Sequence, residues 1–283
     1  MQTITDPREL SRWTQEVRAR GESIAFVPTM GFLHEGHLSL MREARKRADH
    51  LLVSIFVNPL QFGPNEDLDR YPRDPEGDAT KCRSVGCDLL FTPRVASLYP
   101  EGFQTRVQLG PLASRLCGAS RDGHFEGVAT VVLKLFGLVR PNHAVFGSKD
   151  YQQLQIIRRM VRDFDLDVEV VGMPIVREPD GLAMSSRNAY LTTDERSQAL
   201  SLSGSLRALE GWIAAGEQDV ATLIGRMRRL VEEQPMAKVD YIELVDAAEL
   251  SPIETLGTRP ILAALAVRFG GTRLIDNRVI EVG

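Results

Sequence analysis

The segments Ile24-Ala25-Phe26-Val27-Pro28 and His34-Glu35-Gly36-His37 decide the fold of the first part of the chain. The first is continuously apolar, as expected of a buried strand, and the second begins a helical pattern that continues to about residue 48. The order of strand, glycine-containing turn and helix puts two imidazoles beside the unpaired amides of a helix N-terminus. Such a helix start is a ready anion site, so the sequence predicts phosphate binding here.

The composition is that of a folded protein, with 43% hydrophobic and 25% charged residues among 283. The net charge of -4 disfavours broad binding to nucleic acid or to a membrane surface, which needs a basic footprint. Cys82, Cys87 and Cys117 lack CxxC spacing, which disfavours a zinc site or a disulfide framework. We see no signal-peptide pattern and no apolar run near the roughly 20 residues that span a bilayer, so we expect a cytoplasmic protein.

Apolar strand-like runs alternate with helical patterns through the first 175 residues. Strands are expected at 24–28, 51–57, 89–91, 144–146 and 168–171, with a further short strand at 106–109. Helices are expected between them, for example at 124–139 and 149–164. This alternation predicts an α/β fold: a Rossmann-like parallel sheet with helices on both faces.

The pattern changes near residue 176. Helices are expected at 193–215 and 219–233, and strands at 238–245, 261–268 and 272–282, with Gly270-Gly271 turning the last two strands onto each other. We therefore predict two domains, residues 1–176 with the parallel sheet and residues 177–283 as a smaller C-terminal α+β domain.

Four polar segments follow expected strands, at residues 28–37, 58–62, 147–150 and 176–187. Ligands of an open parallel sheet bind beyond the carboxyl ends of its strands, so these segments form the expected site. Gly31 and Gly36 have P-loop spacing, but the Lys and Ser/Thr of a P-loop are missing, so an ordinary P-loop ATPase is rejected.

Each residue singled out has a plainer alternative. His34 and His37 are interpreted as phosphate contacts, against a metal pair without a clear third ligand or satisfied structural histidines. Lys149 begins another helix, where it suits a phosphate or is an exposed first-turn lysine. Gln61 suits a small polar acid or makes ordinary loop hydrogen bonds, and Arg187 suits bidentate phosphate contact or is a solvated arginine.

Three further groups have open roles. Of the neighbouring glutamines Gln152 and Gln153, one is expected at the site and the other at the surface. An acidic group is interpreted mainly as a solvated face that includes at most a magnesium contact: Glu66, Asp67, Asp69, Asp74 and Asp78. Arg121, His124 and Phe125 precede a helix, and spacing alone assigns them no role.

These segments together resemble the pantothenate synthetases, the pantoate–β-alanine ligases of the nucleotidyltransferase superfamily. The resemblance extends over residues 28–37, 56–63, 121–128, 146–153 and 177–188, in family order and at family-like spacing. It implies the condensation of pantoate, β-alanine and ATP to pantothenate, AMP and pyrophosphate through a pantoyl-adenylate, a step in pantothenate and coenzyme A biosynthesis. It also implies Mg²⁺, a Rossmann-like ATP domain, a C-terminal lid domain and a homodimer.

The same resemblance implies residue roles. His37 matches the family's proton donor, Gln61 a contact to pantoate and β-alanine, and Gln153 a contact to pantoate. The matched ATP contacts are Met30, Gly31, Phe32, Leu33, His34, Glu35, Gly36, His37, Gly147, Ser148, Lys149, Asp150, Val176, Met184, Ser185, Ser186 and Arg187. Our hypothesis is that the pentacoordinate phosphate and departing pyrophosphate are stabilised by His34, His37, Lys149, Ser185, Ser186 and Arg187.

Other functions remain open from the sequence. A different nucleotidyltransferase would share the histidine turn but would need a phosphorylated co-substrate, for which the neutral amides of Gln61 and Gln153 are less suited than for pantoate. A tRNA synthetase is disfavoured because the chain lacks a basic face and room for an anticodon domain. A nucleotide-binding scaffold protein would bind ATP without forming AMP.

Overall fold

The computed structural model describes residues 1–64 and 66–282, and the predicted domains include residues 65 and 283, which lie outside this part. The chain folds into two compact units. The first comprises residues 1–113, 118–148 and 153–174, and the second residues 114–117, 149–152 and 175–283. The lid role predicted for residues 177–283 stays a prediction.

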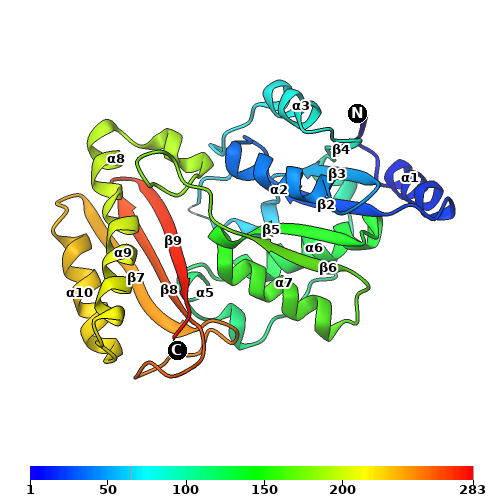
Figure 1. Cartoon of the computed structure of the whole chain (residues 1–283). Helices are drawn as coiled ribbons and strands as arrows, with labels where there is room; N and C mark the ends of the chain where they lie inside the picture. Colours follow the sequence, from blue (N-terminus) through cyan, green and yellow to red (C-terminus); the bar gives the residue numbers. More distant parts are fainter. Residues whose placement is uncertain (65, 283) are drawn as a thin grey trace. The chain divides into compact units, whose positions relative to one another are not determined.

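A six-stranded parallel sheet forms the first unit, with strand order β1-β4-β3-β2-β5-β6 (Figure 1). Its strands are β1 (Gln2–Ile4), β2 (Ile24–Thr29), β3 (His50–Ile55), β4 (Leu89–Phe91), β5 (His143–Gly147) and β6 (Glu169–Met173). The predicted parallel sheet is thus confirmed. The short edge strand β1 was not predicted, and the strand expected at 106–109 was wrong: Val107 donates its amide to Thr130 Oγ1 (3.0 Å) on a helix instead of to a strand.

Helices cover both faces of this sheet. Its helices and helical turns are α1 (Pro7–Ala19), α2 (Glu35–Arg45), η1 (Pro59–Gln61), α3 (Pro75–Ser84), α4 (Val95–Leu98), η2 (Pro111–Ala113), α5 (Cys117–Ser120), α6 (His124–Val139), η3 (Ser148–Asp150) and α7 (Tyr151–Asp163). One apolar core joins a sheet face to α1, α6 and α7, and another joins the opposite face to α2 and α3. Side chains alternate between faces along a strand, so Phe26 enters the first core and Val27 the second. Three boundary elements, α5, η3 and α7, each have residues assigned to both units.

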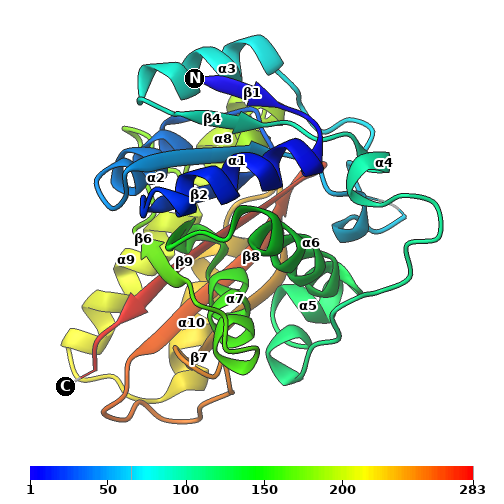
Figure 2. The ribbon, with the colours of Figure 1, turned by 90° about the vertical axis from the view of Figure 1, so that its right-hand side faces the viewer.

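An antiparallel sheet with order β7-β8-β9 forms the core of the second unit. Its elements are η4 (Ser186–Tyr190), α8 (Thr193–Ala199), α9 (Ser201–Ala214), α10 (Val220–Glu232), β7 (Ala237–Asp246), β8 (Ile261–Phe269) and β9 (Thr272–Ile280). Figure 1 shows α9 and α10 along one face of the sheet, and Figure 2 shows its strands side by side. Phe269 pairs with Thr272, which confirms the predicted Gly270-Gly271 turn, whereas the helix predicted at 193–215 is divided at Leu200.

No helix among the described residues is both long enough and apolar enough to cross a membrane.

Candidate functional site

The strand order puts two predicted segments at one edge of the first sheet. From the central strand β2 the chain continues to β3 and β4 on one side, whereas β5 and β6 lie on the other. The order therefore reverses between β2 and β5, which pair in parallel. The loops that follow these two strands contain residues 30–37 and 147–148, at the position where open α/β sheets bind ligands.

Both histidines cap the start of α2. His34 Nδ1 accepts a hydrogen bond from the Gly36 amide (3.1 Å), and His37 Nδ1 accepts one from the His34 amide (3.3 Å). Because a backbone amide only donates, each Nδ1 lacks a proton, so the proton of the neutral ring is on Nε2. The ring centroids are 4.1 Å apart. The pair therefore has a structural role, and the remaining ring proton of each neutral histidine is on Nε2.

A buried carboxylate holds the turn that precedes these histidines. Gly31 and Phe32 have φ angles of 86° and 50°, in the left-handed region. Asp78 accepts hydrogen bonds from the amides of Phe32 (2.8 Å) and Leu33 (2.7 Å), and its side chain is buried. Burial raises the pKa of Asp78, although both amide bonds oppose that shift. The interpretation of the acidic group as a solvated face was therefore wrong for Asp78, which positions the turn from α3, and no signal local to Asp78 identified this contact.

The side chain of Gln61 has a fixed polarity. Asn58 Oδ1 accepts from the Leu60 amide (3.3 Å), and its Nδ2 donates to the Gly127 carbonyl (3.0 Å), so the orientation of the Asn58 amide is determined. Asn58 Nδ2 also donates to Gln61 Oε1 (3.1 Å), which directs Gln61 Nε2 toward Met30 Sδ (3.2 Å). Gln61 thus presents an N–H donor next to the predicted ATP segment.

A second network fixes the backbone of Gln61. His124 Nδ1 lies 2.8 Å from the Gln61 carbonyl, which only accepts, and His124 Nε2 lies 2.9 Å from Arg121 Nη1, which only donates. These two partners select the neutral His124 tautomer with its proton on Nδ1. Arg121 in turn forms a bidentate ion pair with Glu66 (2.6 and 2.7 Å). Burial raises the pKa of Glu66, but contacts with Arg121, the Gly63 amide and His124 together outweigh burial, and the net shift is downward.

Gln152 is not the surface residue expected from the sequence. Its side chain is buried, accepts from the Cys117 amide (3.0 Å) and donates to the Arg115 carbonyl (2.7 Å). Its amide therefore fastens two segments of the second unit to each other. Gln153 belongs to the first unit and is half-buried, and its contact to pantoate stays a prediction.

The remaining predicted ATP contacts belong to the second unit. Lys149 and Asp150 lie in η3, and the Met184 amide donates to the Val176 carbonyl (3.0 Å), which joins two of the predicted contacts directly. Ser185 caps η4 by accepting from the Arg187 amide (3.3 Å). The predicted ATP residues are thus divided, with residues 30–37, Gly147 and Ser148 in the first unit and the others in the second.

Magnesium has no dedicated cage among the residues that the structure describes: no three His, Cys, Asp or Glu side chains there form a group able to hold a metal ion. Both Asp78 oxygens accept amide bonds, and Glu66 pairs with Arg121. Mg²⁺ bound mainly through nucleotide phosphates needs only one or two protein carboxylates. Its presence here stays a prediction.

Comparison with known proteins gives one consistent family. The family model for pantoate–β-alanine ligase matches residues 2–279. Pantothenate synthetase from Trichlorobacter lovleyi is 55% identical over 280 residues, which is 99% of each chain. Pantothenate synthetase from Geobacter sulfurreducens is 52% identical, again over 99% of each chain.

Solved structures agree with this result. Pantothenate synthetase from Thermus thermophilus has a TM-score of 0.93 and 46% identity, covering 100% of this chain and 99% of that one. Pantoate–β-alanine ligase from Francisella tularensis, complexed with Beta-gamma ATP and β-alanine, has a TM-score of 0.80 and 34% identity, covering 99% and 97%. The chain belongs to the pantoate–β-alanine ligase family.

Proposed function

We propose that the chain condenses pantoate with β-alanine at the expense of ATP, through a pantoyl-adenylate, and releases AMP and pyrophosphate. Membership of the pantoate–β-alanine ligase family supports this reaction. The relative from Francisella tularensis, complexed with Beta-gamma ATP and β-alanine, supports two of the three substrates.

The geometric observation behind the proposal is the pair of Nε2–H donors at the start of α2. Both Nδ1 atoms accept backbone amides, so neutral His34 and His37 can donate only through Nε2. An ATP phosphate bound there would gain two ring donors and the positive end of the helix. A metal pair would instead require a third ligand, and the described residues offer no such group.

The first chemical step joins a pantoate carboxylate oxygen to the α-phosphorus of ATP and breaks the bond from that phosphorus to pyrophosphate. The carboxylate is already ionised near pH 7, so no strong base is required. The barrier comes from bringing an anion in line with a polyanionic triphosphate. We assign the stabilisation of this charge to His34, His37, Lys149, Ser185, Ser186 and Arg187. His37 Nε2 donates to the phosphate oxygen on which charge accumulates.

Gln61 would bind pantoate and β-alanine through oxygen atoms that accept its side-chain N–H. Asn58 occupies its carbonyl oxygen, so Gln61 offers Nε2–H to a ligand that accepts. This polarity suits pantoate, and Gln153 is assigned to the same substrate. A phosphorylated co-substrate would instead call for a cation, so the neutral amide disfavours another kind of nucleotidyltransferase.

In the second step the amine nitrogen of β-alanine attacks the acyl carbon, the bond to AMP breaks, and the amine loses a proton. The adenylate must be protected from water until then. We propose that residues 177–283 act as a lid for this purpose. Identical angles between the two units in crystals of the substrate-free and adenylate-bound protein would contradict the lid.

We further propose that Mg²⁺ accompanies ATP, that the chain forms a homodimer, and that it acts in the cytoplasm. A chelator should abolish AMP formation and added magnesium should restore it. Light scattering during gel filtration should give twice the 31.5 kDa of one chain.

The decisive experiment measures AMP release with each substrate omitted in turn. Omission of pantoate should abolish both AMP release and ATP–pyrophosphate exchange. Omission of β-alanine should stop turnover but leave the pantoate-dependent exchange. A scaffold protein would bind ATP without forming AMP, and a tRNA synthetase would need tRNA for product formation. Either result would overturn the proposal.

A further inference from the structure

Two buried polar residues, Asp276 and Asn277, interrupt strand β9. Their exposed fractions are 2% and 6%, although burial otherwise mostly alternates along this strand. Successive side chains of a strand project to opposite faces, so these two are buried in different surroundings. Nothing in the reaction assigned above uses either residue, which leaves their burial to be explained.

Asn277 holds the backbone of Lys149. Its Nδ2 donates to the Lys149 carbonyl over 2.8 Å, across 128 positions of the sequence. Lys149 lies in the short turn η3, and both residues belong to the second unit. The amide therefore fixes the point on the backbone from which the Lys149 ammonium extends.

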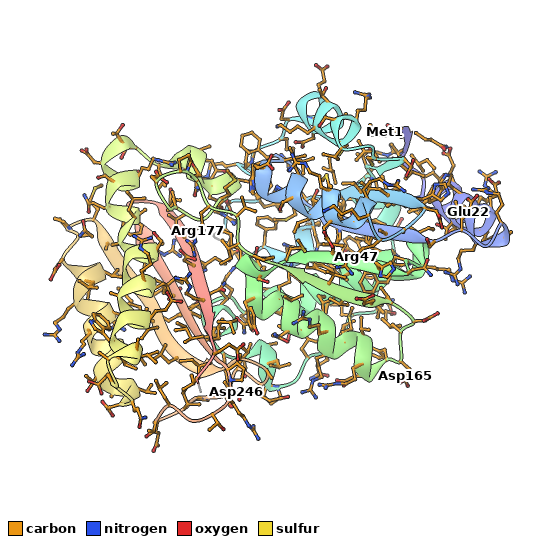
Figure 3. The ribbon with its side chains drawn as sticks, viewed as in Figure 1. Met1, Glu22, Arg47, Asp165, Arg177 and Asp246 are labelled. Carbon is orange, nitrogen blue, oxygen red and sulfur yellow. The ribbon has the colours of Figure 1, made fainter. Side chains whose placement is uncertain are left out.

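Asp276 holds the segment that leads to Arg187. It forms a bidentate ion pair with Arg177 (2.7 and 2.9 Å), which Figure 3 labels beside β9. Arg177 Nη1 also donates to the Gly181 carbonyl (3.1 Å), and Arg177 pairs with Ala183 as an antiparallel bridge. These contacts fix the turn that immediately precedes residues 184–187.

The two residues are also joined to each other, since the Asn277 amide donates to Asp276 Oδ1 (2.8 Å). Adjacent residues of one strand thus hold two segments that are separate in the sequence, η3 and the turn before η4. A buried ion pair gains little net stability because both charges lose water. A role in positioning therefore explains the Asp276–Arg177 ion pair better than a role in stability does.

We propose that Asp276 and Asn277 are positioning residues for ATP: together they set the spacing between Lys149 and residues 184–187. The inference rests on the proposed function, because it assumes that these two segments bind the phosphates. Neither residue is assigned a contact with ATP, and each acts through the segment that it holds. A shift of about 1 Å in a phosphate contact can cost roughly 100-fold in rate, so such fastening matters for adenylation.

The test uses Asn277→Ala and Asp276→Asn in the full chain, with ATP–pyrophosphate exchange measured while ATP or pantoate is varied. We expect kcat/KM for ATP to fall by roughly 10- to 100-fold, with KM for pantoate within about twofold of wild type because Gln61 lies in the first unit. Asn277→Ala leaves the Arg177 ion pair in place, so it tests the proposal even if Asp276→Asn folds poorly.

Two control variants separate positioning from stability. Glu210→Gln breaks the ion pair between Glu210 of α9 and Arg278 of β9 (2.7 Å). This variant should leave KM and kcat for ATP unchanged. Val267→Ala removes buried volume from the same sheet and should lower the melting temperature without changing KM for ATP.

The possible outcomes test the positioning role of Asp276 and Asn277 separately from the proposed ligase reaction. Wild-type protein that forms no AMP with pantoate, β-alanine and ATP would refute the proposed function. Active wild-type protein, together with Asn277→Ala and Asp276→Asn variants that lose thermal stability but retain wild-type KM and kcat for ATP, would overturn the positioning role.

Discussion

The two compact units hold their proposed phosphate-binding groups in different ways. In the first unit, His34 and His37 are fixed by backbone amides two and three residues away. In the second unit, β9 fixes the segment with Lys149 from 128 residues away and the segment that leads to Arg187 from 99 residues away. The histidine caps depend on a short motif, with Asp78 holding the preceding turn from 45 and 46 residues away. The second arrangement depends on partners at least twice as far apart in the sequence.

This difference determines where each half is vulnerable. Substitutions in the turn before α2 should disturb the first unit's phosphate contacts directly. Substitutions far along the chain, in β9, should disturb those of the second unit. Single substitutions in each unit therefore test whether the two sets of phosphate contacts are held differently.

Lys149→Ala should have the largest effect. If the ammonium stabilises the charge that develops on pyrophosphate, its loss should raise the adenylation barrier by about 3–4 kcal/mol, or roughly 100- to 1,000-fold in rate. Pantoate-dependent ATP–pyrophosphate exchange measures this step directly. Lys46→Ala is the control, because the Lys46 side chain is 73% exposed and pairs with Glu43 on the surface of the first unit. Near-wild-type exchange in Lys149→Ala would contradict the assigned role of Lys149 in stabilising the charge on pyrophosphate.

Gly31→Ala tests the local arrangement of the first unit. A Cβ at Gly31 would lie 2.9 Å from Ile55 Cγ2 and 3.0 Å from Asp78 Oδ2, and φ is positive there. We expect a loss of about 1–3 kcal/mol in the free energy of unfolding and a higher KM for ATP. Urea titration and exchange kinetics measure the two effects.

Gly137→Ala is the matched control for that substitution. No described atom outside its own helix turn lies within 4 Å of a Cβ at this exposed position in α6, so alanine should gain about 0.5–1 kcal/mol. Equal effects of the two substitutions would show that the turn at Gly31 is not strained, and the local explanation of the first unit would fail.

The sequence predicts the local half of this site well. The His34–His37 turn, the strand before it and the helix after it are all signalled by residues within about 20 positions. The Gly270-Gly271 turn is predicted equally well, because two adjacent glycines separate two strand-like segments. Patterns of this kind depend on periodicity and capping, which are properties of short windows.

The remote contacts have no such signature. Asp276 and Asn277 lie in a segment whose pattern indicates only a strand, and their partners are fixed by tertiary folding. One of Gln152 and Gln153 was expected at the surface, but Gln152 is buried and its partners, Cys117 and Arg115, are brought to it only by tertiary folding. The edge strand β1 has one apolar residue among its three, whereas the equally short β4, which was predicted, is entirely apolar.

The smallest effect is expected from Glu66→Gln, which tests a second remote contact of the first unit, in addition to the one that Asp78 makes with the turn before α2. The Glu66 pKa is lowered in the folded protein: burial raises it, but contacts with Arg121, the Gly63 amide and His124 together lower it more. A lowered carboxyl pKa stabilises the fold above the unfolded value of about 4.3, and that stabilisation is lost as the pH falls through the folded pKa. The free energy of unfolding of wild type should therefore exceed that of Glu66→Gln by roughly 1 kcal/mol at pH 7. This difference in stability should shrink below about pH 4.

Thermal melting at both pH values measures this difference, and Glu232→Gln is the control because its ion pair with Arg228 lies on the exposed face of α10. Because Arg121 and His124 hold the Gln61 carbonyl, Glu66→Gln should also raise KM for pantoate more than KM for ATP. A larger rise in KM for ATP than in KM for pantoate would mean that Glu66, Arg121 and His124 position groups that bind the nucleotide. The Glu66–Arg121 pair would then support the first unit's phosphate contacts from a distance, as Asp78 does.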